Sequence, residues 1–170
     1  QEVDRLNRAI SELLEFARPT DLKPQPTDMR FLVERSLQLV RQDAADHDIR
    51  IETRIDDDLC PVWIDPDRFS QCLLNLYLNA IQAMDKGGTL GVRCRSDRAR
   101  QLEIAVSDTG QGIAPADRQQ IFNPYFTTKP KGTGLGLAIV HKIVEAHEGR
   151  LQVETSTGKG SRFTLRLPCR

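Results

Sequence analysis

Asn75-Leu76-Tyr77-Leu78-Asn79-Ala80 lies in the middle of a predicted helix over residues 66–84. Asp65 precedes Pro66 at its start, and this pair is typical of a helix N-terminus because Asp caps free N–H groups and Pro fits the first turn. Asn75 and Asn79 are four residues apart, so their side chains share one helix face. Amide oxygens are hard ligands that suit Mg²⁺. On these two residues alone, a solvated polar stripe is an equally good interpretation.

Predicted strands and further helices flank this central helix on both sides. Strict alternation of apolar and polar residues over 49–55 is typical of a half-buried strand, and polar or Gly-rich turns separate the others. The expected strands are 49–55, 62–64, 89–95, 102–107, 151–155 and 162–167, and the other expected helices are 27–47, capped by Thr27 or Asp28, 115–122, and 135–147, stopped by Gly149. We therefore expect an α/β two-layer sandwich, with a mixed sheet of about five strands under three helices.

The first 18 residues follow a different pattern. Apolar residues recur there at spacings of three or four, as in a coiled-coil seam: Val3, Leu6, Ile10, Leu13 and Ala17. This helix should end before Pro19, and the three prolines of residues 19–26 suit a stiff linker or an edge strand. We expect a helix fragment over 1–18, a linker over 19–26 and one domain over 27–170.

Composition excludes several classes of function. The 24 basic residues balance 24 acidic ones, so no overall charge attracts nucleic acid. No apolar run reaches the roughly 18 residues of a membrane span, and Gln1 follows no start methionine or signal peptide, so we expect an excised fragment. The scattered cysteines suit a reducing, cytoplasmic setting. The cysteines lack zinc-ligand spacing, and we expect idle or buried thiols rather than disulfides: Cys60, Cys72, Cys94 and Cys169.

A second chemical signal is Asp108-Thr109-Gly110-Gln111-Gly112-Ile113, which begins where an apolar strand ends. Its two glycines allow the backbone to approach a flat ligand closely. An ionised Asp108 only accepts hydrogen bonds, so it matches the exocyclic amine of adenine and opposes the carbonyl of guanine. Taken alone, the motif is more often a tight structural turn.

A third signal is Gly132-Thr133-Gly134-Leu135-Gly136-Leu137-Ala138, which opens directly into a helix. Free backbone N–H groups and the positive helix end would face an incoming anion there. The run lacks the lysine and serine of a P-loop, and no strand precedes it as in a dinucleotide fingerprint. Nearby Lys129 could reach a terminal phosphate as a mobile charge. Glycines that merely start a helix and a solvated lysine are the alternatives.

The order of these pieces is more specific than any single piece. Asn75 to Ala80, Asp108 to Gly112, Phe122 to Phe126 and Gly132 to Gly136 resemble the N, G1, F and G2 boxes of sensor histidine kinases. This family belongs to a superfamily with type II topoisomerases, the ninety-kilodalton heat-shock chaperone and mismatch-repair ATPases. Gly158-Lys159-Gly160-Ser161 resembles the last glycine box. The resemblance covers nearly everything from Pro26 onward and is strongest to the nitrogen-regulation and zinc-responsive sensor kinases.

The resemblance implies a role for each candidate residue. Asn79 would be the Mg²⁺ ligand and Asn75 its phosphate-side companion, and with Lys129 they would form the catalytic set. Asp108 would read adenine. The other residues expected around ATP are Gly110, Gly112, Ile113, Phe122, Phe126, Thr128, Gly132, Thr133, Gly134, Leu135 and Gly136. Phe122 and Phe126 would pack at the hinges of a lid over residues 123–133.

The implied activity is transfer of the γ-phosphate of Mg-ATP to a histidine, for relay to an aspartate of a response regulator. Residues 1–18 resemble the end of the dimerisation and phosphotransfer hairpin, so the accepting histidine is expected upstream of Gln1. His47, His141 and His147 match no accepting motif. The implied partners are that upstream histidine domain, a response regulator receiver domain and a second copy in a homodimer, with no nucleic acid. The parent protein is expected in the bacterial inner membrane.

Three alternatives stay open. In hydrolytic relatives a glutamate general base lies four residues before the Mg²⁺ asparagine, where this chain has Asn75. An amide cannot take up a proton at neutral pH, which favours a kinase over a conformational ATPase. A serine kinase of the anti-sigma type shares the fold but would not need the seam of residues 1–18. A non-catalytic interaction module would bind no nucleotide.

Overall fold

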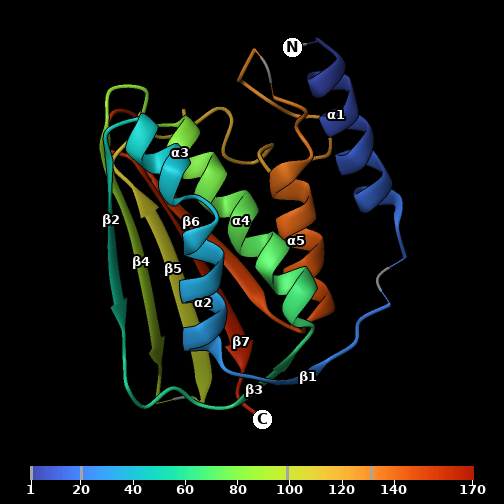
Figure 1. The fold of residues 1–170 in the computed structure, drawn as a ribbon, viewed down its shortest axis with the longest axis vertical. Helices are drawn as coiled ribbons and strands as arrows, with labels where there is room; N and C mark the ends of the chain where they lie inside the picture. The colour runs from blue at the N-terminus through green and yellow to red at the C-terminus, as the bar shows by residue number, and fades with distance from the viewer. Residues whose placement is uncertain (1, 20, 99, 131) are drawn as a thin grey trace.

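A five-stranded mixed sheet forms the centre of the computed structural model, which describes residues 2–19, 21–98, 100–130 and 132–170 (Figure 1). The strand order is β2-β4-β5-β7-β6, with β2 parallel to β4 and the other neighbours antiparallel. The strands are β2 (Ile49–Ile55), β4 (Gly88–Ser96), β5 (Gln101–Asp108), β6 (Arg150–Thr155) and β7 (Ser161–Pro168). The predicted mixed sheet is confirmed.

Three helices cover one face of this sheet: α2 (Met29–Gln38), α4 (Pro66–Gln82) and α5 (Gly136–Ala146) (Figure 1). The core between the two layers is apolar, and its largest side chains, Phe69 and Leu73 of α4 and Ile104 of β5 among them, are fully buried. Burial of this surface stabilises the sandwich. The expected two-layer α/β fold is therefore confirmed.

Helix α4 begins and faces the core as the sequence predicts. Asp65 Oδ1 accepts hydrogen bonds from the backbone N–H groups of Asp67 and Arg68, at 3.1 Å each, and Pro66 occupies the first turn. The buried stripe of α4 consists of Phe69, Cys72, Leu73, Leu76, Tyr77, Ala80 and Ile81. The candidate amides lie beside this stripe and are half-buried, so the core positions them at its edge.

Short strand β1 (Gln25–Thr27) pairs antiparallel with β3 (Val62–Ile64) in a separate two-stranded sheet. The predicted strand over 62–64 is thus confirmed, and the end of the proline-rich segment forms an edge strand. Pro26 tolerates this place because an edge strand does not need every backbone N–H in the ladder.

His147 joins the end of α5 to the start of α4. Its Nδ1–H donates to the carbonyl of Ile143 at 2.7 Å, and its Nε2 accepts from the backbone N–H of Asp65 at 3.0 Å. The ring also meets Phe69 edge-on, with centroids 5.8 Å apart. A packing or capping role for His147 is therefore confirmed. The left-handed residue that follows the helix is Glu148, with φ of 58°, rather than the expected stop residue Gly149.

Helix α1 (Glu2–Ala17) packs beside α5 (Figure 1). Lys142 Nζ donates to the carbonyls of Phe16 and Arg18, at 2.6 and 2.9 Å, and lies 5.4 Å from the centre of the Phe16 ring. These contacts cap the end of α1, where backbone carbonyls lack helical partners. The seam residues Val3, Leu6, Ile10 and Leu13 stay exposed.

Two helix predictions were wrong in detail. The helix expected over 27–47 is split into α2 and α3 (Arg41–Asp46) at Leu39 and Val40. No helix breaker is present there. Val40 and Ala44 are both buried while Leu39 is exposed, so packing against the core decides the break. The helix expected over 115–122 is a series of turns, because its backbone hydrogen bonds recur only at every third residue, from Asp117, Gln120 and Asn123.

The expectation of idle thiols was wrong for two of the four cysteines. Cys60 and Cys169 form a disulfide, with a Cα–Cα distance of 5.6 Å that lies in the usual range. They are 109 residues apart in sequence, so only the fold brings them together. Cys72 and Cys94 are free and buried, as expected. No helix within the described ranges is long and apolar enough to cross a bilayer.

Candidate functional site

The candidate site forms where the loop before α5 folds over the C-terminal half of α4. Lys129 Nζ donates to Asn79 Oδ1 at 2.6 Å and to Gln82 Oε1 at 3.1 Å, and it lies 3.5 Å from the Asn79 carbonyl. Residues 50 positions apart in sequence thus meet. The Lys129 ammonium and the expected metal-binding oxygen are therefore in direct contact, with the oxygen as hydrogen-bond acceptor.

Asn75 lies one helical turn before Asn79 on the same face. Its side-chain Nδ2 is buried and has no hydrogen-bond partner among the described residues. An unpaired buried donor is costly, by about 1–3 kcal/mol, and requires an explanation. The amide is therefore in place to donate to an acceptor that enters the site.

Asp108 ends β5 next to this pair and is buried. One of its carboxylate oxygens accepts from the backbone N–H of Gly110 at 2.9 Å. Burial raises the pKa of Asp108, against the opposing effects of the Gly110 and Ser161 N–H groups and the Lys129 charge. Burial also lowers the pKa of Lys129, while the charges of Asp108 and Asp85 oppose that change. Burial therefore disfavours the charged forms of both Asp108 and Lys129.

The glycines after Asp108 are fixed by backbone packing within the protein. A Cβ at Gly110 would lie 2.3 Å from the Ala83 carbonyl oxygen, and one at Gly112 would lie 2.1 Å from that of Ser156. Gly112 also has φ of 70°, where side chains are strained. The loop therefore rests between the end of α4 and the β6–β7 turn. Close packing of protein on protein explains both glycines here.

The Gly132–Gly136 turn leads into α5 as expected. Its helix has no side-chain cap hydrogen bond at Leu135, so the first N–H groups of α5 are free to meet an anion. The Gly134 carbonyl accepts from the backbone N–H of Tyr125 at 2.9 Å, which ties the turn to the loop. Thr133 Oγ1 donates to the Glu12 carboxylate of α1. The turn is therefore coupled to the N-terminal helix.

The remaining predicted residues lie around this centre. Leu135 is buried in the core, and partly buried Ile113, Phe122 and Phe126 pack against it. The Phe122 ring also lies 5.6 Å from the ring of His141. The hinge role expected for the two phenylalanines is compatible with this packing. Thr128 is exposed at the loop surface, and the predicted lid includes residue 131, which lies outside the described residues.

Sequence reasoning missed Gln82, Asp85 and Glu12 as neighbours of the site. Gln82 follows Asn79 by three residues and so shares its helix face, a spacing that could have identified it. Asp85 follows at the end of the same helix and acts on Lys129 through its charge. Glu12 could not have been found, because its contact with Thr133 spans 121 positions and depends on how α1 docks.

Comparison with known proteins gives consistent matches. Residues 64–170 match the family described as histidine kinase-, DNA gyrase B- and HSP90-like ATPases. The chain is 52% identical over 168 residues to the sensor histidine kinase ZraS of Escherichia coli K12, covering 99% of this chain and 36% of that protein. It thus spans about a third of the length of such curated relatives.

Solved structures of histidine kinases also match the chain. The crystal structure of full-length ShkA in complex with AMPPNP superposes with a TM-score of 0.88 at 29% identity, over 98% of this chain and 36% of that one. The histidine kinase ThkA in complex with the response regulator protein TrrA superposes with a TM-score of 0.83 at 26% identity, over 99% and 48% of the two chains. Both similarities extend over α1 as well as the sandwich.

Proposed function

The chain belongs to the histidine kinase-, DNA gyrase B- and HSP90-like ATPase family, and we propose that it binds Mg-ATP and transfers the γ-phosphate to a histidine in two-component signalling. The similarity to a sensor histidine kinase over 99% of the chain supports the kinase branch of this family. One arrangement carries the proposal: Asn79 Oδ1 accepts from the Lys129 ammonium, and the unpaired Asn75 Nδ2 lies one helical turn away.

The residues present fit both ATP and Mg²⁺. Asn79 Oδ1 is a hard oxygen that accepts from the Lys129 ammonium, so it would serve Mg²⁺ in the same way. Asp108 is a buried acceptor suited to the adenine amine, and the uncapped start of α5 offers N–H groups to phosphates. When bound, Mg²⁺ neutralises charge on the phosphates. Thr133 and Gly134 lie beside that helix start.

The chemistry proposed for the chain is positioning rather than proton transfer. Asn75 occupies the place of the hydrolytic glutamate, and its Nδ2 can donate a hydrogen bond but cannot accept a proton at neutral pH. Lys129 would leave Asn79 and hold the terminal phosphate. The nucleophile would then be a histidine brought by another segment, and orientation would supply most of the rate.

Movement of helix α1 would affect this site. Glu12 holds Thr133 in the phosphate-binding turn, and Glu15 forms an ion pair with Arg68 of α4. A shift or rotation of α1 would change both contacts together, so the position of the helix would control access to the turn. Because α1 would move as a separate unit, we propose residues 19–26 as the linker between it and the domain. We also propose a homodimer that forms through the exposed α1 seam.

The wider setting follows from the proposed activity. The phosphorylated histidine would pass its phosphate to an aspartate of a response regulator, in agreement with the ThkA–TrrA complex, which superposes over 99% of this chain. We propose that the domain acts in the cytoplasm and that its parent protein is anchored in the bacterial inner membrane.

Phosphate release separates a kinase from an ATPase of the same fold. The chain with Mg-ATP should release almost no phosphate, whereas Asn75→Glu should release it measurably faster because a general base is restored. A separately produced dimerisation and phosphotransfer hairpin, carrying the accepting histidine expected upstream of Gln1, should take up the γ-phosphate when wild-type chain is added. Rapid release by the wild type without transfer to the hairpin would instead support a conformational ATPase.

A further inference from the structure

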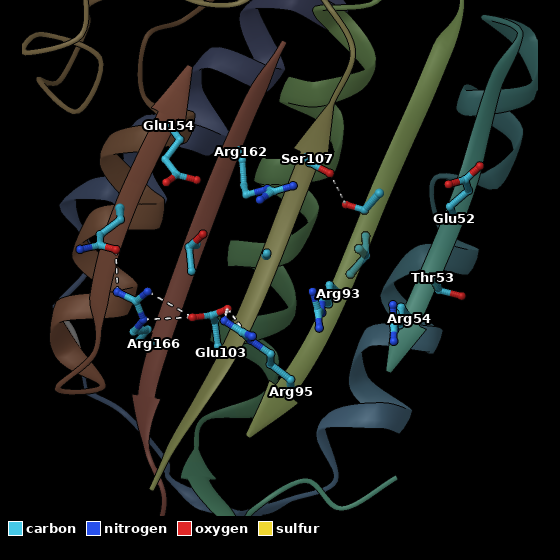
Figure 2. A pocket seen from close by; sticks show the side chains of 15 residues that line it. Glu52, Thr53, Arg54, Arg93, Arg95, Glu103, Ser107, Glu154, Arg162 and Arg166 are labelled. Atoms are coloured by element: carbon cyan, nitrogen blue, oxygen red, sulfur yellow. Dashed lines mark hydrogen bonds and ion pairs between the residues drawn. The ribbon is translucent and has the colours of Figure 1, made fainter. Parts of the chain in front are cut away.

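The face of the sheet away from the helices carries a polar hollow of about 460 Å³ (Figure 2). Side chains alternate along a strand, so Ser107 faces this hollow while its neighbour Asp108 faces the helices. The hollow is therefore on the opposite side of the sheet from the nucleotide site. Its size is in the range of small-molecule sites in proteins.

Small side chains make the floor of the hollow. Gly91, Ala105, Ser107 and Thr164 lie on adjacent strands β4, β5 and β7, in register across the sheet. A Cβ at Gly91 would lie only 2.6 Å from Ser107 Oγ, so a larger residue there would displace the serine. The floor thus carries two hydroxyl-bearing residues, half-buried Ser107 and buried Thr164, and long side chains surround it.

The side chains that line the hollow carry more positive than negative charge. Five arginines and three glutamates line the hollow, although the whole chain has no net charge. Glu103 forms ion pairs with two of the arginines: its oxygens lie 2.7 Å from Arg95 Nη2 and 3.1 Å from Arg166 Nη2 (Figure 2). Glu52 lies 3.6 Å from Arg50.

Three arginines of the hollow remain without a carboxylate partner within the described ranges: Arg54, Arg93 and Arg162. Arg54 and Arg93 are directly opposite each other on β2 and β4 (Figure 2). Like charges placed directly opposite in a sheet are destabilising. Glu154 is opposite Arg162 on β6 but makes no ion pair with it in the described structure. The sheet therefore tolerates a repulsion that an anion would relieve.

We propose that this hollow binds a small, multiply phosphorylated anion through Arg54, Arg93 and Arg162, with Ser107 and Thr164 as hydroxyl donors. Guanidinium groups present paired N–H donors that match phosphate oxygens. Among the described residues, no aromatic side chain lines the hollow, so they provide no aromatic stacking surface for a nucleobase. The recognised chemistry is the phosphate groups, and this site is separate from the one that would take ATP.

Pyrophosphate without Mg²⁺ is a suitable probe, titrated into the chain and followed by calorimetry and by backbone amide chemical shifts. The wild type should bind with a Kd below 1 mM, with shifts at Ser107 and Thr164. Arg54→Gln and Arg93→Gln should each weaken binding by about tenfold or more, since each loses a charged hydrogen-bond donor to phosphate. Arg35→Gln, an exposed arginine on α2, is the charge-matched control and should bind as the wild type does.

The two arginine variants should fold at least as well as the wild type, because each removes a repulsion, so thermal unfolding checks them independently. Absence of binding below 1 mM overturns the proposal. So does equal weakening in Arg35→Gln, which would show unspecific attraction, or shifts confined to residues 132–136, which would place the anion in the other site. None of these results depends on whether the chain binds ATP.

Discussion

Lys129 Nζ lies 2.6 Å from Asn79 Oδ1, the oxygen that we assign to Mg²⁺. In the structure the lysine therefore occupies the cation side of this amide, and it must move before a metal ion can bind there. The same lysine would then be free for the terminal phosphate. We therefore expect Lys129 to exchange Asn79 for the terminal phosphate when Mg-ATP binds.

Replacement of Asn79 should remove the effect of the metal. Asn79→Ala should lower ATP affinity by about tenfold or more, because a metal ligand interaction is lost, and the remaining binding should no longer respond to Mg²⁺. Calorimetric titration with and without Mg²⁺ measures both effects. Leu78→Ala, an adjacent exposed position on α4, is the control and should keep wild-type binding. Persistent Mg²⁺ dependence in Asn79→Ala would assign the metal to another group.

Replacement of Asp108 should leave the protein as stable as before or more stable, but should remove its preference for ATP. Burial raises the pKa of this carboxyl, so the folded state holds the proton more tightly than the unfolded state does. Stability therefore decreases as pH rises from about 3.8 through the folded pKa, and the loss persists at neutral pH. Asp108→Asn should unfold at the same or a higher temperature than the wild type at pH 7, yet lose its preference for ATP.

Thermal unfolding between pH 3.5 and 7 tests this sign, with Asp58→Asn as a control at an exposed position. The difference in melting temperature between Asp108→Asn and the wild type should grow with pH, whereas the control should show no such trend. A variant that is much less stable at pH 7 and unchanged in ATP affinity would identify Asp108 as a structural residue.

The loop over residues 123–133 should close on the γ-phosphate. ATP should protect it from trypsin more strongly than ADP does, because ADP lacks the group that Lys129 would hold. The Lys129–Pro130 bond resists trypsin, so the cleavage to follow is the one after Lys131. A time course of limited proteolysis, with cleavage after Lys86 as the internal reference, measures the difference. Equal cleavage with both nucleotides would argue against a lid that senses the terminal phosphate.

Helix α1 should restrain the phosphate-binding turn. Glu12→Ala removes the acceptor for Thr133 Oγ1, so amide hydrogen exchange in residues 132–136 should become several-fold faster. Ser11→Ala, the exposed neighbour, should leave this exchange unchanged. Unchanged exchange in Glu12→Ala would mean that α1 and the turn are not coupled through this contact.

The disulfide should stabilise the domain under oxidising conditions. It closes a loop of 109 residues between Cys60 and Cys169, and cross-links of that length contribute about 3–5 kcal/mol. Cys60→Ser with Cys169→Ser should lose that amount in denaturant unfolding without reductant and match the reduced wild type. Cys94 should stay unreactive until unfolding, since burial raises its pKa to about 12. Equal stability of the double variant and the oxidised wild type would exclude the bond.

Much of the fold could be predicted because local signals agreed with tertiary packing. The Asp65-Pro66 start of α4, the alternation in β2 and the hairpin of β6 and β7 all depend on neighbours in sequence. The break between α2 and α3 could not be predicted, because burial of Val40 decides it. The disulfide also depends on the fold, because its two cysteines are 109 residues apart in sequence.

The candidate site was predictable to a similar degree. Motif order identified Asn75, Asn79, Asp108 and Lys129, and the structure brings them together around the end of α4. The roles of Gly110 and Gly112 were only partly foreseen, since both glycines are needed for packing against backbone carbonyls. The hollow on the opposite sheet face had no sequence signal, because its arginines come from three separate strands.

Calorimetric titration of the chain with ATP and then GTP, with and without Mg²⁺, is the decisive measurement for the proposed kinase site. We expect ATP binding that Mg²⁺ strengthens, with clearly weaker binding of GTP, because the Asp108 carboxylate has no donor for the guanine carbonyl. Equal binding of the two nucleotides, or no binding of either, would contradict the assignment of Asp108 and Asn79 and with it the proposed kinase site.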